Sequence, residues 1–461
     1  MRIKGMATLA LVTLPLAGHM HPMVVAARAL REAGHHPVVV GPHDLVTRLP
    51  DDVDRHAIGE AELPPGALDT RCACLARMRG LDDMRAMFSL IAQLSDFYIR
   101  HLPTALEALG AAALIHDQLE PGAGIVARGL SRSLGLKHVS LACALPMNRE
   151  AAVPPPFLGW KYRDGSFWRW IHVGYYTVVN ALLAEQGRAL EAGAERFGLG
   201  KPARNPDGTA LEDWQKAWSV DDGLSRTHDV AQGLASLDYP RARPPAYLGP
   251  LRDTASRYPG LAAIQSERDG RPLCFVSLGT LMGSRGAVLG AMARAADARG
   301  LQPVVVHGGR LEDATVLPRG TIARDFLDQR AVMADSAAAL LHGGYNSTND
   351  AVAAGLPVVL APLAFEQGAI AARVERAQLG RAVSHRGRGL SQRIALALED
   401  MQSDPAAQAA RRRARFEALA APGRAGLVAT VDAALDGHAH ARPKPRAVTE
   451  PGRSAVPLPA E

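Results

Sequence analysis

Cysteine is scarce in this sequence. The 461 residues contain 4 cysteines, Cys72, Cys74, Cys143 and Cys274. Their spacing matches neither a zinc site nor a redox motif, and the first two are too close in sequence to bridge easily. The cysteine content therefore favours a reduced, cytoplasmic compartment.

Long hydrophobic runs are also missing. A membrane-spanning helix needs about 18–20 consecutive apolar residues. The longest approach to this is residues 351–365, which Gly355, Pro357 and Pro362 interrupt. The sequence therefore predicts no membrane-spanning helix.

Dense basic stripes interleaved with aromatic residues are absent as well. There are 52 Lys and Arg against 46 Asp and Glu, and the net charge is +6. This mild excess excludes a nucleic acid as the expected partner. The compact basic run at residues 411–413 and Arg415 is interpreted as a solvated helix face, with contact to an anionic membrane surface as the alternative.

The first apolar run, residues 7–17, follows Arg2 and Lys4. This arrangement resembles a signal peptide. A buried first strand of an α/β fold has the same pattern, and Gly18 leads directly into an amphipathic helix. We therefore expect a strand over residues 7–14.

Short apolar runs and amphipathic segments then alternate along the chain. Further strands are expected at residues 37–40, 111–115, 137–141, 273–278, 302–306, 321–322, 337–341 and 358–361, and helices at 22–33 and 168–197. This βαβ rhythm is typical of parallel sheets with helices on both faces, so the predicted fold class is α/β.

The length and the interrupted rhythm indicate two domains. We expect an N-terminal Rossmann-like domain over 1–240, a linker over 241–260, a C-terminal Rossmann-like domain over 261–435 and a disordered tail over 436–461. Two such domains face each other across a cleft, where ligands usually bind.

The strongest motif begins where the apolar run ending at Leu341 stops. It reads His-Gly-Gly-Tyr-Asn-Ser-Thr-Asn-Asp over residues 342–350, and Glu366 and Gln367 follow. Two glycines allow a tight turn close to a ligand. The helix after them offers free N–H groups and a dipole that favour a phosphate.

Helix capping explains only part of this motif. Asn346 or Ser347 is suited to cap the helix, and Asp350 lies three residues after Ser347, as in a capping box. Capping does not explain His342 or the Glu366-Gln367 pair.

The motif resembles the donor-binding signature of the UDP-dependent glycosyltransferases of the GT-B fold. That signature begins with His-x-Gly-x-Asn-Ser, has an acid four residues after the Asn, and closes on an Asp/Glu-Gln pair. The resemblance assigns to the UDP-sugar site His342, Gly344, Asn346, Ser347, Asp350, Glu366 and Gln367. It implies that His342, Asn346 and Ser347 contact the diphosphate. It also implies that Asp350 holds the ribose and the Glu366-Gln367 pair the sugar.

Two upstream segments extend the resemblance. Residues 325–329 fall where the family binds uracil, so Phe326 would stack on the base and Gln329 matches the family's glutamine. The alternative is that Phe326 is a core residue. The strand and loop that end at Gly279 and Thr280 resemble the second donor-binding loop.

The catalytic residues are expected in the other domain. Residues 18–22, Gly-His-Met-His-Pro, match the family's Gly-His-x-x-Pro. The resemblance implies that His19 deprotonates the acceptor, and imidazole suits this role because its pKa lies near working pH. Asp117, at a strand end, matches the acid that orients the base. The alternatives are a helix-capping His19 and a solvated Asp117.

Residues 157–176 concentrate the aromatic side chains. Eight aromatics occur there: Phe157, Trp160, Tyr162, Phe167, Trp168, Trp170, Tyr175 and Tyr176. They form either a helix core, or an apolar acceptor channel or membrane-interface face.

Residues 116–118, 145–150, 153–157 and 325–329 together narrow the resemblance to the carotenoid branch of the family, the zeaxanthin glucosyltransferases. This implies an inverting transfer of a hexose, glucose by analogy, from a UDP-sugar to a hydroxyl of a hydrophobic acceptor such as zeaxanthin. A polyketide or other terpenoid acceptor is the main alternative, and a non-catalytic binder of UDP-sugar or lipid a more remote one.

No cofactor is expected besides the UDP-sugar co-substrate. The histidines near the N-terminus, His19, His21, His35, His36 and His43, are irregularly spaced without accompanying acids, so no metal site is predicted. A nicotinamide cofactor is not expected, because no Gly-x-Gly-x-x-Gly follows the first strand. The predicted location is the cytoplasm, with peripheral contact at the inner face of the membrane.

Overall fold

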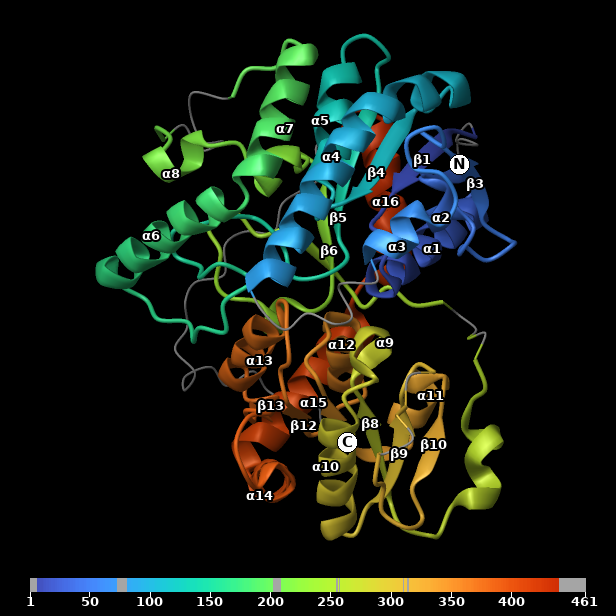
Figure 1. The fold of residues 1–461 in the computed structure, drawn as a ribbon, viewed down its shortest axis with the longest axis vertical. Helices are drawn as coiled ribbons and strands as arrows, with labels where there is room; N and C mark the ends of the chain where they lie inside the picture. Colours follow the sequence, from blue (N-terminus) through green and yellow to red (C-terminus); the bar gives the residue numbers. More distant parts are fainter. Residues whose placement is uncertain are drawn as a thin grey trace.

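The computed structural model describes residues 6–72, 81–201, 209–253, 256, 258–309, 311–312 and 315–438. It contains two parallel β-sheets, each flanked by helices, in two lobes stacked along the long axis of the molecule (Figure 1). The sequence prediction of two α/β domains with parallel sheets is therefore confirmed. The predicted disordered tail lies outside the described residues from position 439 onward.

The N-terminal sheet has 7 strands in the order β3-β2-β1-β4-β5-β6-β7. The strands are β1 Thr8–Val12, β2 His36–Gly41, β3 Asp54–Ala57, β4 Ala113–Asp117, β5 Lys137–Ala142, β6 Asp229–Gln232 and β7 Ala246–Gly249. β1 pairs in parallel with β2 and β4, so the first apolar run forms a central, buried strand, as the strand interpretation predicted.

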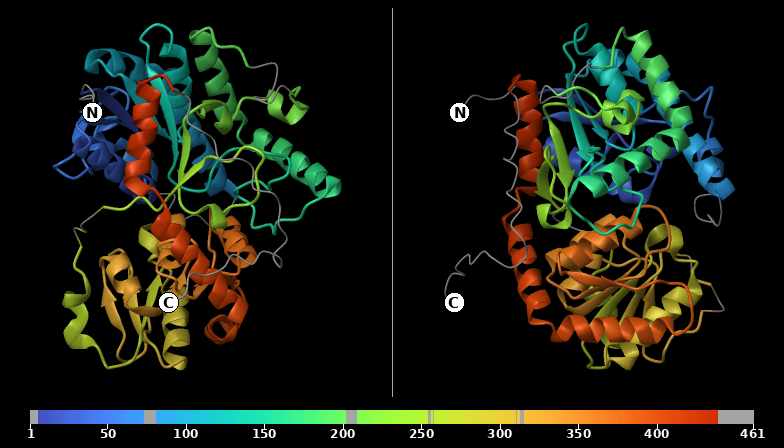
Figure 2. Two further views of the ribbon diagram at one scale, coloured as in Figure 1. Left: turned by 180° about the vertical axis from the view of Figure 1, so that it is seen from behind. Right: turned by 90° about the vertical axis from the view of Figure 1, so that its left-hand side faces the viewer.

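Helices α1 to α8 accompany this sheet. Their bounds are α1 Ala17–Glu32, α2 His43–Val46, α3 Ala67–Cys72, α4 Leu81–Leu109, α5 Pro121–Leu130, α6 Ser166–Leu182, α7 Ala184–Arg196 and α8 Asp213–Lys216. The continuous helix predicted over 168–197 is two helices, because the chain leaves helical geometry at Leu183. Helix α6 projects from the body of the lobe in Figures 1 and 2.

The C-terminal sheet has 6 strands in the order β10-β9-β8-β11-β12-β13. They are β8 Leu273–Ser277, β9 Gln302–Val306, β10 Ile322–Arg324, β11 Ser336–Leu341, β12 Val358–Leu360 and β13 Gly380–Ala382. The helices after them are α9 Gly279–Met282, α10 Gly286–Ala298, α11 Gln329–Ala334, α12 Tyr345–Ala353, α13 Gln367–Arg376, α14 Leu390–Ser403, α15 Pro405–Ala420 and α16 Gly423–Leu435.

Two segments differ from the expected domain boundaries. Residues 246–249, placed in the linker by their polar, Pro-rich surroundings, form β7 at the edge of the N-terminal sheet. Helix α16, assigned to the C-terminal domain, returns to the first lobe (Figure 2). There its Leu427 and Val431 join the core that contains Leu9 and Val25 of β1 and α1. Both differences arise because burial across distant segments outweighs local composition.

Among the described residues, no helix is both long and apolar enough to cross a membrane.

Candidate active site

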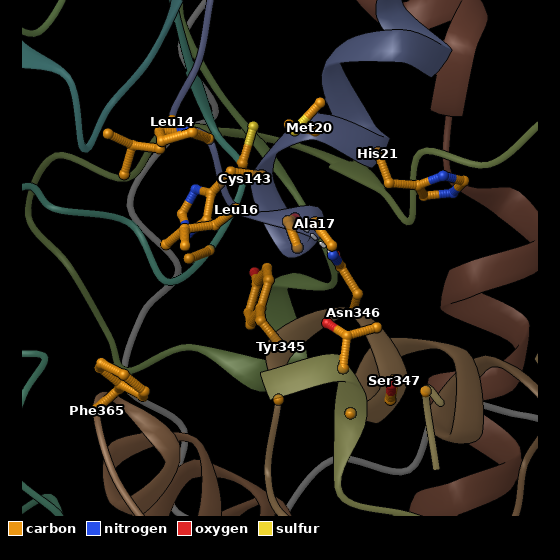
Figure 3. A pocket seen from close by; sticks show the side chains of 18 of the residues that line it. Leu14, Leu16, Ala17, Met20, His21, Cys143, Tyr345, Asn346, Ser347 and Phe365 are labelled. Carbon is orange, nitrogen blue, oxygen red and sulfur yellow. Dashed lines mark hydrogen bonds between the residues drawn. The ribbon is translucent and has the colours of Figure 1, made fainter. Parts of the chain in front are cut away.

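A cavity of about 640 Å³ lies between the two domains. Every predicted UDP-sugar residue lines it, and so does His19. Side chains from the two domains face each other across it, with Leu16 and Cys143 on one side and Tyr345, Asn346 and Ser347 on the other (Figure 3). We call the lining residues before 253 the N-terminal wall and those after 258 the C-terminal wall.

The N-terminal wall is mainly apolar. Side chains from the β1–α1 loop, α1, α4 and the loops after β4 and β5 contribute to it: Leu14, Leu16, Met20, Met87, Phe88, Leu90, Ile91, Leu94, Leu119, Cys143, Met147, Phe157 and Leu183. Sequence reasoning did not single out the α4 residues, because an apolar stripe on a helix has the same pattern whether it faces a core or a cavity.

The aromatic cluster is divided rather than concentrated at this cavity. Of the eight aromatics, Phe157 lines the cavity. Tyr176 is buried and stacks on Trp214, with ring centroids 4.8 Å apart. Phe167 and Trp170 are exposed on α6. Neither the helix-core nor the acceptor-channel interpretation therefore describes the whole cluster.

His19 and Asp117 form a hydrogen-bonded pair in the N-terminal wall. His19 is the third residue of α1, and Asp117 ends the buried strand β4. The His19 Nδ1 and Asp117 Oδ2 atoms are 2.6 Å apart. Asp117 is 1% exposed, and its Oδ1 accepts a hydrogen bond from the backbone N–H of Leu119 at 3.1 Å. Asp117 is therefore a fixed, buried acid, not the solvated acid of the alternative interpretation.

The environment decides the protonation of this pair. Burial raises the pKa of Asp117, but the charge and hydrogen bond of His19 outweigh it, so the pKa lies below its usual value. Burial lowers the pKa of His19, but the charge and hydrogen bond of Asp117, helped by the charge of Glu366, raise it above its usual value. The carboxylate thus accepts the Nδ1–H proton, which leaves Nε2 as the basic atom.

Helix α1 begins earlier than predicted. The expected start was residue 22, but α1 starts at Ala17 with Leu16 at the N-cap, so His19 does not cap it. Pro22 lies inside the helix and has no N–H to donate to the carbonyl of Gly18 four residues before it. That carbonyl instead accepts a hydrogen bond from Asn346 Nδ2 of α12 at 2.7 Å. The proline thereby frees a carbonyl that joins the two walls beside His19.

The C-terminal wall centres on the N-terminus of α12. This helix starts at Tyr345 with Gly344 at its N-cap, and no side chain caps it. The predicted capping by Asn346 or Ser347 is therefore wrong, because both residues already lie inside the first turn. The uncapped N–H groups and the helix dipole make this end suited to an anion.

His342 lies against two glycines beside this helix start. A Cβ atom on Gly344 would lie 2.6 Å from His342 Nε2, and one on Gly279 would lie 3.0 Å from the same atom. Gly279 also has a φ of 70°, which favours glycine. Burial lowers the pKa of His342 to about 4. The ring is therefore neutral and can donate a hydrogen bond without carrying a charge.

Asp350 is the centre of a polar network. Its Oδ1 accepts from Arg252 Nε at 2.6 Å, and its Oδ2 accepts from Gln329 Nε2. Gln329 Oε1 in turn accepts from Ser347 Oγ at 3.2 Å. The structure thus brings together three predicted residues from α11 and α12.

Arg252 and Gln232 are functional candidates that sequence reasoning missed. Arg252 Nη2 donates to the backbone carbonyl of Asn346 at 3.0 Å, and its Nη1 donates to Gln232 Oε1 at 3.1 Å. Gln232 Nε2 donates to Asn346 Oδ1 and to the carbonyl of Cys143, both at 2.6 Å. Both residues lie in a polar stretch without periodicity, so no local signal marked them.

The Glu366-Gln367 pair splits into two environments. Burial raises the pKa of Glu366, whereas the charge of His19 acts in the opposite direction. Gln367 Oε1 accepts from the backbone N–H groups of Leu363 and Ala364 at 2.8 and 3.0 Å. The side-chain carbonyl of Gln367 thus stabilises the loop that precedes this residue, whereas Glu366 and His19 line the same cavity.

Phe326 and Thr280 complete the predicted set. Phe326 is 40% exposed and stacks on Tyr258, with the two ring centroids 5.2 Å apart and an interplanar angle of 12°. Its interpretation as a core residue is therefore wrong. Thr280 lies in the first turn of α9, on the same wall as Phe326.

No group of three or more His, Cys, Asp or Glu side chains in the described part of the chain is placed to hold a metal ion. The predicted absence of a metal requirement stays a prediction.

The two parallel-sheet domains place an uncapped helix N-terminus opposite a His-Asp pair across the cavity. The chain is 30% identical to a zeaxanthin glucosyltransferase of Pseudescherichia vulneris over 411 residues, which covers 86% of this chain and 91% of that protein. It is 29% identical to a zeaxanthin glucosyltransferase of Pantoea ananas over 393 residues, covering 82% and 85%. The chain belongs to the glycosyltransferase family that includes these zeaxanthin glucosyltransferases.

Solved structures agree on the fold. The glycosyltransferase of kitacinnamycin matches with a TM-score of 0.67 at 18% identity, covering 94% of this chain and 100% of that one. Glycosyltransferase VinC in complex with dTDP matches with a TM-score of 0.62 at 17% identity, covering 93% and 100%. No family model matches the chain.

Proposed function

We propose that this glycosyltransferase moves a hexose, glucose by analogy, from a UDP-sugar to a hydroxyl of a hydrophobic acceptor, and that the acceptor is a carotenoid such as zeaxanthin. The observation that carries the proposal is the His19–Asp117 pair, held at 2.6 Å in an apolar wall that faces the free N-terminus of α12. A base beside an apolar chamber and an anion site opposite it are what this transfer requires.

The transfer follows from these positions. His19 Nε2 takes the proton of the acceptor hydroxyl, and Asp117 stabilises the imidazolium that forms. The acceptor oxygen attacks the anomeric carbon from the face opposite UDP, and the bond from that carbon to the diphosphate oxygen breaks. The configuration is therefore inverted, and UDP leaves with the electron pair.

The charge of the leaving diphosphate is met by dipoles. The uncapped N–H groups of α12 and the neutral ring of His342 lie on one wall, and Arg252, whose charge is paired with Asp350, lies beside them. We infer that these groups make a divalent metal unnecessary. Glu366 lines the same cavity, close enough to His19 for their charges to interact, and would hold sugar hydroxyls there.

The base and ribose have candidate partners on the same wall. The exposed ring of Phe326 offers a stacking surface for uracil, backed by Tyr258. Asp350 is held by Arg252 and Gln329 and would bind the ribose hydroxyls. VinC, a structural neighbour, binds a thymidine diphosphate, so the nucleotide is part of the test below.

The acceptor proposal depends on the apolar N-terminal wall and on the relatives. Most residues of that wall are apolar, with Leu, Met, Ile and Phe among them, and such a wall favours an acceptor with a long hydrocarbon body. The two relatives that span most of the chain are named for zeaxanthin. A polyketide or other terpenoid would use the same chamber and is an outcome of the test.

Product analysis by mass spectrometry tests the proposal. Purified protein is incubated with detergent-dispersed zeaxanthin and either UDP-glucose or dTDP-glucose, with and without chelator. We expect a mass gain of one or two hexoses from UDP-glucose that survives chelator. The linkage, determined by NMR of the product, should be β.

The variants His19→Ala and His21→Ala are compared in the same assay. Both histidines lie on α1 and line the cavity, and the hydrogen bond to the strand-end acid Asp117 comes from His19. We expect product formation to be lost with His19→Ala and kept with His21→Ala. UDP release without a carotenoid product would show that the acceptor is another compound. An α-linkage in the product would contradict the inverting mechanism. A protein that binds no UDP-sugar would contradict the whole proposal.

A further inference from the structure

Helix α6 presents an apolar face to solvent. Phe167 is 62% exposed, Trp170 70% and Val178 52%, and Tyr175 and Leu182 are also exposed. Because each residue turns a helix by about 100°, these five positions fall within an arc of roughly 140°. The opposite side, with His172 and Tyr176, is buried. A contiguous apolar face of this kind marks an interaction surface.

The charges around this face have one dominant sign. Between residues 160 and 182 the basic residues are Lys161, Arg163 and Arg169, and the only acid is Asp164. All four are exposed, and the Arg163 guanidinium lies 4.7 Å from the centroid of the Trp168 ring. Lys161 also pairs with Glu375 at 3.5 Å, and Arg169 falls outside the arc of the apolar face. These basic residues form a cationic rim at the N-terminal end of α6, and exposed Trp, Phe and Tyr beside such residues are typical of a helix that lies in the interface of an anionic bilayer.

The segments that flank α6 contribute residues to the lining of the cavity. Leu183, the residue after α6, and Phe157, in the loop before it, both line the cavity. The same loop is fixed to α6, because Trp160 packs edge-on against Tyr175 with ring centroids 4.2 Å apart. A surface on which α6 lies would therefore adjoin the apolar N-terminal wall.

We propose that the exposed face of α6 docks on an anionic lipid bilayer and so gives the apolar chamber access to an acceptor dissolved in that bilayer. The second half rests on the proposed function, because only a hydrophobic acceptor partitions into lipid. The docking of α6 on the bilayer does not depend on the proposed function. Docking needs no spanning helix, since aromatic side chains and the cationic rim reach only the headgroup region.

Vesicle flotation of the full chain tests the docking. The vesicles are phosphatidylcholine alone or phosphatidylcholine with about a third phosphatidylglycerol. We expect binding to the anionic vesicles, weaker binding to the neutral ones, and a loss of binding as salt is raised. The double variant Phe167→Ser/Trp170→Ser should reduce binding about tenfold or more, because it removes the two most exposed aromatics of the face.

A matched control is available on α15. Phe416 and Leu419 are 59% and 73% exposed there, beside the exposed Arg412, Arg413 and Arg415, but none of these residues lines the cavity. If the bilayer docks on α6 and not on α15, the variant Phe416→Ser/Leu419→Ser should keep vesicle binding. Binding that is lost with the α15 variant and kept with the α6 variant would overturn the proposal. The proposal would also be overturned if the wild-type protein does not bind anionic vesicles and sedimentation shows that it self-associates through α6.

Activity separates this proposal from the proposed function. With acceptor dispersed in detergent, the α6 variant should work within about twofold of wild type, whereas with acceptor in anionic vesicles its rate should fall along with binding. Vesicle binding without any glucosylation would support the docking surface on α6 and contradict the proposed acceptor. Equal rates of variant and wild type on vesicle-borne acceptor would overturn the delivery role.

Discussion

The two walls of the cavity are specified in different ways. The largest single part of the C-terminal wall comes from one stretch, residues 342–367, in which a strand end, two glycines and a helix start follow one another. The N-terminal wall is assembled from α1, α4 and loops after β4 and β5, with side chains far apart in the sequence, such as Leu14 and Leu183, which are separated by 169 residues. A local motif suffices for an anion cradle, whereas a chamber requires tertiary packing.

The walls also differ in how they use charge. The N-terminal wall is apolar and concentrates its chemistry in one pair, His19 and Asp117. The C-terminal wall spreads its chemistry over helix N–H groups, a neutral His342 and the network around Asp350. A base needs one partner that fixes its proton, whereas a diphosphate is best met by many small dipoles.

Asp117→Asn should produce the largest effect if the comparison is correct. The amide cannot hold the imidazolium, so we expect kcat to fall about 10²–10⁴-fold while the donor KM stays near wild type. Asp117 raises the pKa of His19, and the base works unprotonated. In wild type the rate rises as pH increases through that raised pKa, and in the variant this acid limb moves to lower pH.

The measurement is the pH dependence of kcat/KM for the acceptor, with thermal unfolding as the control for folding. An acid limb that stays in place, or moves to higher pH, would show that Asp117 does not set the protonation of His19.

Gly344→Ala should affect only the C-terminal wall. Its Cβ would lie 2.6 Å from His342 Nε2, so the ring or the turn must shift at the start of α12. We expect the donor KM to rise about tenfold or more, with little change in acceptor KM. Steady-state kinetics with each substrate varied in turn measures both constants.

The matched control is Gly174→Ala. Gly174 lies in α6, where an added Cβ meets no atom within 4 Å. It should leave both KM values unchanged and stabilise the protein by about 0.5–1 kcal/mol. A rise in acceptor KM for Gly344→Ala would contradict the division between the walls.

Arg252→Lys should have a smaller effect that reaches both walls. Lysine keeps the charge but cannot contact Asp350, Asn346 and Gln232 together. Losing part of this network corresponds to about 1–1.5 kcal/mol, so we expect the donor KM to rise about five- to tenfold.

Arg271→Lys is the control, because Arg271 pairs with Asp269 and Asp297 on the exposed surface away from the cavity. A double variant with Asp350→Asn sharpens the test, since residues in one network give non-additive effects. Additive effects of the two changes would show that Arg252 and Asp350 act separately.

Much of the fold could be predicted from periodicity. The strand over 302–306 has the predicted bounds, and those at 137–141 and 358–361 differ by one residue. β3, β6, β7 and β13 were missed, because they are 3 or 4 residues long and lie at or near sheet edges. Such strands depend on their neighbours for pairing and leave little periodic signal.

The residues of the candidate site also divide into those that a local sequence signal marked and those that it did not. His19, Asp117 and the residues of the 342–367 stretch were marked by the resemblance of short motifs, and all of them meet at one cavity or directly behind it. Arg252 and the α4 residues carried no such mark. Their roles depend on what lies opposite them in space.

The sequence by itself determined the two parallel-sheet domains, the glycine turn before α12 and the pairing of a histidine with a strand-end acid. The first two features depend on backbone propensity and on residues close in the chain, whereas the pairing of His19 and Asp117, 98 residues apart, followed from the resemblance of two short motifs. Only the tertiary structure decided that α16 packs on the first domain, that Pro22 leaves the Gly18 carbonyl to Asn346, and that α6 turns aromatic side chains to solvent. The reason is physical: burial and hydrogen bonding between distant segments are set by which surfaces meet, and local sequence does not encode that meeting.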